Sequence, residues 1–81
     1  MAKTWDKETL GSAYIYLQNG MYFKLEHIHS GEWVAFVMLR GLNSNHEIMS
    51  WEWEGVHGLE RAKELAYSAL KTWVTDFAES I

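Results

Sequence analysis

The sequence contains neither cysteine nor proline among its 81 residues. The absence of cysteine excludes a disulfide framework and any metal site built on thiolates, and it fits a reducing compartment such as the cytosol. The absence of proline leaves glycine and asparagine as the strong turn signals. Because internal repeats, low-complexity tracts and linkers are missing too, residues 1–81 are predicted to form a single domain.

Long apolar runs and positive charge are also scarce. No segment approaches the roughly 20 apolar residues of a membrane span, and the first residues lack the apolar core of a signal peptide. We therefore expect a cytoplasmic protein that makes no contact with membranes. Seven basic residues stand against eleven acidic ones, for a formal net charge of −4. This charge repels a phosphate backbone, so binding to nucleic acid is not expected from composition.

Aromatic residues, by contrast, are abundant: five Trp, four Tyr and three Phe. A chain this short buries only about 60% of the surface that its unfolded form exposes. Small domains commonly gain stability from disulfides, a metal ion or oligomerisation. With disulfides excluded, oligomerisation is the natural candidate. Aromatic side chains carry large contact areas, so some of them are expected to meet a partner.

Three segments have the apolar patterns of β-strands. Residues 21–29 alternate, with Phe23 and Leu25 on one face. Residues 32–39 contain an unbroken apolar run, which is typical of a central strand, and residues 46–54 alternate again. Residues 59–81 follow Gly58 with apolar positions at the three-four spacing of a helix that packs on a sheet. That apolar stripe consists of Leu59, Ala62, Leu65, Ala66, Ala69, Leu70, Trp73, Val74 and Phe77.

Residues 4–20 allow two interpretations. Leu10, Ala13, Tyr14 and Leu17 recur at helical spacing, and Thr4 or Asp6 is available as an N-cap. The same segment alternates from residue 13 to 17 and ends in Asn-Gly, a strong hairpin signal. The polar first turn favours the helix. The fold class predicted is therefore α+β: a three-stranded antiparallel meander, four-stranded if residues 4–20 form a strand, packed on the long C-terminal helix, with a short N-terminal helix.

The central strand, residues 32–39, has apolar side chains on both of its faces. Its residues alternate between two apolar sets, so whichever set faces the helices, the other remains uncovered in a three-stranded domain. An uncovered apolar patch of a few hundred Å² tends to mark an interaction site. We assign the contact to Val34, Phe36 and Met38, although the opposite strand phase is possible. The mixed rim of this partner-binding patch consists of Tyr22, Ile48, Glu52 and Glu54.

Three arrangements could bury the uncovered apolar face of the sheet. Residues 4–20 fold over it as a strand or arm, or a homodimer stacks its sheet faces or pairs an exposed edge strand. In the third, a different protein covers the face. Homodimers are common among chains with a self-complementary patch.

Signals for chemistry are weak. His27 and His29 lie two apart on a predicted strand, which is half of a zinc site, and His46 and His57 are the remaining histidines. Ordinary polar histidines are the simpler interpretation. Trp51 and Trp53 could stack on the bases of single-stranded nucleic acid. The neighbouring glutamates would repel its phosphates, so these tryptophans are expected to pack in the core. No nucleophile elbow, phosphate loop or metalloprotease motif occurs, so no enzyme, metal or cofactor is predicted.

The predicted order helix, meander, helix resembles the double-stranded-RNA-binding domain. The likeness runs from residues 22–25 through Gly31 and residues 33–36 to residues 59–66. That family grips phosphates with a lysine cluster at the start of its second helix. Here those positions carry no net charge, so RNA binding is not expected to transfer. They are Glu60, Arg61, Lys63 and Glu64.

Residues 32–73 are also similar to the partner-binding domain of HicB-type antitoxins, in which a meander precedes an acidic, alanine-rich helix and the sheet docks on a toxin. Both resemblances imply a scaffold that works by surface contact. Compact acidic chains of this kind are common among phage-encoded inhibitors of host defence. The expected function is therefore a non-catalytic, protein-binding inhibitor or regulator that acts as a homodimer. The alternative is a nucleic-acid-binding domain.

Overall fold

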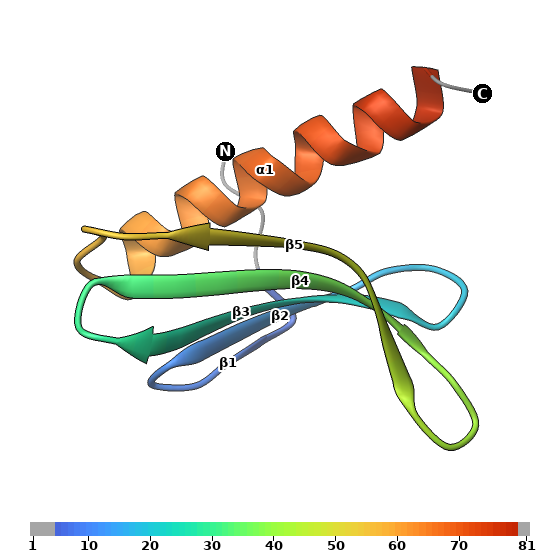
Figure 1. The fold of residues 1–81 in the computed structure, drawn as a ribbon, viewed down its shortest axis with the longest axis horizontal. Helices are drawn as coiled ribbons and strands as arrows, with labels where there is room; N and C mark the ends of the chain where they lie inside the picture. Colours follow the sequence, from blue (N-terminus) through green and yellow to red (C-terminus); the bar gives the residue numbers. More distant parts are fainter. Residues whose placement is uncertain (1–4, 80–81) are drawn as a thin grey trace.

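The structure is a computed structural model that describes residues 5–79, and side chains through residue 76. Five strands form one antiparallel sheet in the order β1-β2-β3-β4-β5, and a single helix follows them (Figure 1). The strands are β1 (Lys7–Glu8), β2 (Ser12–Tyr16), β3 (Met21–His29), β4 (Glu32–Arg40) and β5 (Asn45–Trp53), and the helix is α1 (Leu59–Glu79). The predicted α+β class, antiparallel meander and C-terminal helix are confirmed, but the predicted number of strands is too low.

The predicted N-terminal helix is wrong, because the part of this segment that the structure describes forms β1 and β2. Ala13 and Ile15 are almost fully buried, whereas Tyr14 lies on the opposite face. Asn19 and Gly20 both have positive φ, at 62° and 78°, which is the backbone that a tight two-residue hairpin turn requires. The Asn-Gly hairpin signal therefore outweighs the helical spacing, because pairing with β3 satisfies the backbone and buries alternate side chains.

Asp6 does not cap a helix. Its Oδ2 accepts a hydrogen bond of 2.8 Å from the backbone N–H of Tyr16, and its own N–H donates to the carbonyl of Tyr14. These two bonds hold Asp6 beside β2. Thr4, the other predicted cap, lies outside the described residues.

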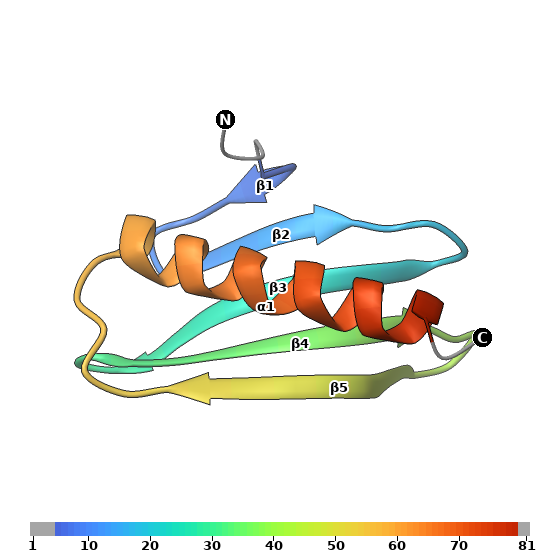
Figure 2. The same ribbon diagram turned by 90° about the horizontal axis from the view of Figure 1, so that it is seen from above.

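The helix crosses one face of the sheet, so the molecule has two layers (Figure 2). The core lies between them, and Phe23, Leu25 and Val37 are its largest fully buried side chains. Trp51 and Trp53 pack against this core, as predicted, and the Phe23 and Trp51 rings meet edge to face at 5.9 Å. The remaining buried core side chains are Trp5, Ala13, Ile15, Trp33, Ala35, Val56, Ala62, Ala66 and Leu70.

The connection between β5 and α1 is fixed by hydrogen bonds to the β3–β4 turn. The Trp33 indole N–H donates to the Val56 carbonyl at 3.1 Å, and the Val56 N–H donates to the Gly31 carbonyl at 3.0 Å. The Gly58 carbonyl then accepts the first helical bond, from Ala62. These contacts aim α1 back across the sheet.

The apolar stripe of α1 agrees with the prediction in its centre and departs from it at the edges. Ala62, Ala66 and Leu70 are buried, whereas Val74 is 48% exposed. Tyr67, which the predicted stripe omits, packs against the core. The side chain of Phe77 lies outside the described residues. No helix among the described residues combines the length and apolar character that a membrane span requires.

Candidate functional site

The strand phase of β4 leaves the predicted contact residues on the sheet face opposite α1. Trp33, Ala35 and Val37 belong to the core under the helix. Val34, Phe36 and Met38 therefore alternate to the other side, which we call the far face. Strand register brings three rows together there: Tyr16-Tyr22-Met38-Glu47, Tyr14-Lys24-Phe36-Ser50 and Ser12-Glu26-Val34-Glu52, with Lys7 beside Tyr14.

No element between residues 5 and 79 covers the far face (Figures 1 and 2). The arm that sequence analysis allowed over this face is instead part of the sheet, because β1 and β2 extend it beyond β3. Trp5 packs on the helix side, with its ring 5.8 Å from that of Phe23. The far face is thus an open platform, on which Phe36 and Met38 are half-buried and Val34, shielded by its neighbours in the sheet, is 6% exposed.

Cations accompany the tyrosines of the far face. The Lys7 and Lys24 ammonium groups lie 5.6 and 5.7 Å from the centre of the Tyr14 ring, and the Arg40 guanidinium lies 6.0 Å from that of Tyr22. Lys24 also forms an ion pair of 3.4 Å with Glu26. Burial is the largest single influence on the pKa of Lys24 and lowers it, but Glu26 and Tyr14 together outweigh burial and raise this pKa.

Two residues of the predicted rim lie elsewhere than expected. The register shifts between Val37, which pairs with Met49, and Met38, which pairs with Glu47. Ile48 is therefore the extra residue of a β-bulge, 45% exposed and opposite no residue of β4. Glu54 lies beyond the end of β5 and is not part of the far face. Glu52 and Tyr22 lie where the alternation predicted.

The N-terminal strands contribute far-face residues that are absent from the predicted contact. Lys7, Tyr14 and Tyr16 reach the far face because β1 and β2 are strands. The helical interpretation put Tyr14 with the apolar stripe of a helix. The alternation from residue 13 to 17 and the Asn-Gly turn were the signals that identify them.

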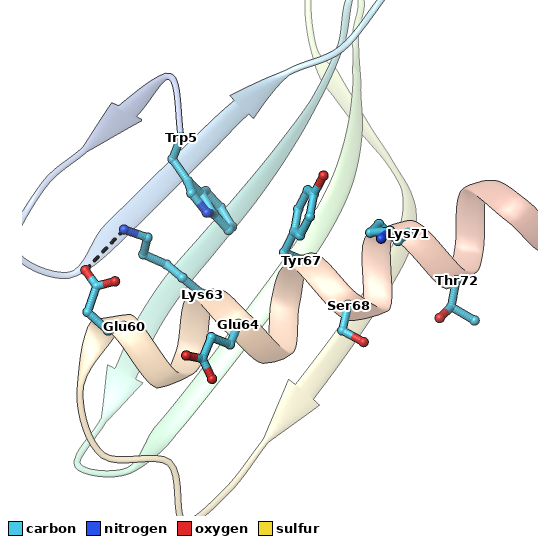
Figure 3. Close-up of a pocket in the computed structure, with 8 residues that line it drawn as sticks. All are labelled: Trp5, Glu60, Lys63, Glu64, Tyr67, Ser68, Lys71 and Thr72. Carbon is cyan, nitrogen blue, oxygen red and sulfur yellow. Dashed lines mark hydrogen bonds and ion pairs between the residues drawn. The ribbon is translucent and has the colours of Figure 1, made fainter. Parts of the chain in front are cut away.

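A shallow pocket lies on the other side of the molecule, between α1 and the N-terminal segment (Figure 3). Its volume is about 520 Å³. The Lys63 ammonium is bound by Glu8 of β1 and by Glu60, at 3.2 Å, so this cation ties the helix to the edge strand. Lys71 lies over the Tyr67 ring at 5.9 Å. The pocket is lined by Trp5, Glu60, Lys63, Glu64, Tyr67, Ser68, Lys71 and Thr72.

Replacing Glu8 with glutamine is expected to lower the pKa of Lys63. The hydrogen bond that Lys63 donates to the Glu8 carboxylate is the largest cause of the raised pKa of Lys63, which lies above its ordinary value of 10.5. The pKa of Lys63 is higher in the folded state than in the unfolded state. The contact with Glu8 therefore stabilises the fold below pH 10.5, and this stabilisation is lost as pH rises through the raised pKa. NMR titration of the lysine side chains measures the pKa of Lys63 in the wild type and in the variant. Glu64→Gln is the control, since Glu64 pairs with Arg61, and an unchanged Lys63 pKa in Glu8→Gln contradicts the assignment.

The basic residues at the start of α1 are already paired. Arg61 donates to Glu64 at 3.0 Å, and Lys63 is bound as described above. No cluster of unpaired lysines is therefore offered to phosphates by this turn of the helix. The order of elements also lacks the first helix of the double-stranded-RNA-binding domain within the described residues.

The histidines are dispersed. The His27 ring packs on Trp33, with ring centres 4.6 Å apart, and a register shift separates it from His29. His46 lies 3.5 Å from the Ser44 hydroxyl, and His57 lies beside Gly31. Among residues 5–76, whose side chains the structure describes, no three His, Asp or Glu side chains are placed to share a metal ion.

Comparison with known proteins does not assign the chain to a family. No protein-family model matches the sequence. A search of curated proteins finds no significant match. No solved structure matches the fold at a significant level.

Proposed function

We propose that this protein is a non-catalytic, protein-binding module that forms a homodimer through its far face. The observation that carries this proposal is the open row of apolar side chains on β4, Val34, Phe36 and Met38, with Tyr22 next to Met38 on β3 and Tyr14 one strand further away on β2. A module of this kind acts by occupying its partner, so an inhibitory or antitoxin-like regulatory role is its concrete form.

The size of the far face is of the order that a dimer requires. With strands about 4.8 Å apart and about 3.3 Å per residue, four strands present a flat area of roughly 500 Å². A standard interface buries about 800 Å² of accessible surface per partner. Since about 25 cal/mol is gained per Å² of apolar area, burial of a few hundred Å² contributes several kcal/mol. This is comparable with the whole stability of a small domain.

The charges of the far face complement a second copy. Lys7 lies on the edge strand β1, whereas Glu47 and Glu52 lie on the opposite edge strand β5. A two-fold axis that runs along the central strand β3 stacks β5 of one copy over β1 of the other. Lys7 of each copy then lies near the two β5 glutamates of its partner, and the apolar row of β4 lies over Tyr14 and Tyr16 on β2 of the other copy, so the arrangement joins opposite charges at the edges and apolar side chains between them.

Replacing Phe36 with glutamate is expected to raise the dimer dissociation constant by about tenfold or more, because each copy then buries an unpaired charge. Sedimentation equilibrium measures the change. Leu42→Glu is the matched control, since Leu42 is fully exposed in the β4–β5 loop and lies off the far face. A wild-type protein that stays monomeric at high concentration would overturn the homodimer.

A charge exchange tests the two-fold arrangement separately. Lys7→Glu is expected to weaken the dimer, and adding Glu52→Lys in the same chain is expected to restore part of the affinity. Additive losses in the double variant would contradict the stacking of β5 over β1.

Nucleic-acid binding is the alternative function, and one observation favours it. Cations beside the half-buried Tyr14 and Tyr22 on an open sheet suit the stacking of single-stranded bases. Three glutamates on the same face, Glu26, Glu47 and Glu52, oppose it by repelling phosphates. Fluorescence anisotropy with single-stranded and double-stranded oligonucleotides separates the two functions. Binding to either that falls steeply between about 50 and 200 mM salt would support the alternative.

A further inference from the structure

The outer edge of β5 is a second, separate open surface. This strand is last in the sheet order and pairs with β4 alone among the described strands. It is nine residues long, whereas the opposite edge strand β1 has two. Long, unpaired edges present a row of backbone donors and acceptors, which is a template for strand addition. The bulge at Ile48 interrupts the strand early, and residues 49–53 continue in regular register.

An apolar groove runs beside this edge, between β5 and α1. Its volume is about 400 Å³, and Met49 on its rim is 37% exposed. Figure 2 shows that α1 crosses the middle of the sheet and leaves β5 at the side. The apolar lining of the groove consists of Met49, Trp51, Trp53, Leu65, Ala69 and Trp73. A strand added to β5 would place every second side chain against this lining.

The charges around the edge select the occupant. Residues 45–58 contain three glutamates and neither lysine nor arginine, and Asp76 lines the groove. Pairing with the β5 edge of a second copy would bring glutamates together, and like charges opposite one another destabilise a strand pair. A basic segment gains from the same charges. The glutamates on this edge thus oppose self-pairing and favour a heterologous strand.

From this geometry we infer that β5 and the groove beside it accept an extended segment of another protein, in which apolar side chains alternate with lysine or arginine. The apolar side chains enter the groove against Trp51 and Trp53, and the basic ones lie over Glu52 on the other side of the strand. The edge opens sideways from the sheet, so this site remains accessible when the far face is covered. Its backbone edge and its groove are separate from the proposed dimer surface, and Glu52 is the one residue named for both.

A nine-residue peptide of alternating lysine and valine, matched to the length of β5, is the probe. Titration into ¹⁵N-labelled protein is expected to shift the β5 amide signals and to slow their hydrogen exchange. A peptide of alternating glutamate and valine controls for charge. A lysine-valine peptide with N-methylated alternate amides controls for backbone pairing. Both are expected to bind at least about tenfold more weakly.

Glu54→Lys with Asp76→Lys tests the charge selection without touching the far face. Both residues are exposed. The expected result is an affinity for the basic peptide reduced by about tenfold or more. Glu60→Lys with Glu64→Lys makes the same change in net charge among the residues that line the other pocket, and is expected to retain most of the affinity.

Three results would overturn the site. The first is a basic peptide that leaves the β5 amides unshifted, and the second is equal binding of the acidic or N-methylated peptide. The third is protection that rises with protein concentration in the absence of peptide at the β5 amides and not at those of β2 to β4, since this would show a second copy on the edge. A monomeric wild type that still binds the peptide would remove the far-face dimer and leave this site intact.

Discussion

Replacing Phe23 with alanine is expected to lower the free energy of unfolding by about 3–5 kcal/mol. Phe23 is fully buried on β3, where its ring contacts those of Trp5 and Trp51. Alanine removes these contacts and leaves a cavity, since residues of the sheet and the helix surround the site and cannot all move inward. For a domain of this size the loss is a large part of its stability. Urea denaturation followed by circular dichroism measures it.

Phe36→Ala is the matched control, because it makes the same substitution on the adjacent strand but on the far face. Half-burial on an open sheet predicts a loss of only about 1 kcal/mol in the monomer. In the dimer the loss is larger, and it depends on protein concentration, because Phe36 then lies in the interface. Equal, concentration-independent losses in the two variants would contradict the assignment of Phe23 to the core and Phe36 to the dimer surface.

Replacing Ala66 with glutamate is expected to cost several kcal/mol and to leave little cooperative unfolding. Ala66 is fully buried where α1 rests on the sheet. A glutamate there either buries an unpaired carboxylate or forces the helix away from β3 and β4. Near-ultraviolet circular dichroism reports the result, because the tryptophans lose their fixed environment when the two layers separate.

Ser68→Glu is the control on the same helix. Ser68 is exposed, and glutamate forms helices as readily as serine, so this variant is expected to keep stability within about 0.5 kcal/mol of the wild type. An Ala66→Glu variant as stable as Ser68→Glu would show that the helix packs on the sheet through a different face.

The candidate site was predictable where the alternation of side chains along a strand decides which residues share a face. Residues 33–39 alternate in an extended strand, so Val34, Phe36 and Met38 had to share one side of it. Which side faces the helix depends on packing. The larger set, with Trp33 and Val37, lies under α1, where the Trp33 indole also finds the Val56 carbonyl. The bulge at Ile48 has no signal in the sequence, because it arises from how β5 pairs with β4.

Local pattern by itself predicted β3, β4 and β5 to within one residue at each end, and the helix that begins at Leu59, because period and turn residues are properties of adjacent positions. Tertiary structure decided the rest. Residues 12–16 carry both a helical and an alternating pattern, and pairing with β3 selects the strand, because it buries Ala13 and Ile15 in the core. The same pairing put β1 and β2 at the side of the sheet instead of over it. The far face is open for that reason: a chain segment that lengthens a sheet cannot also cover it.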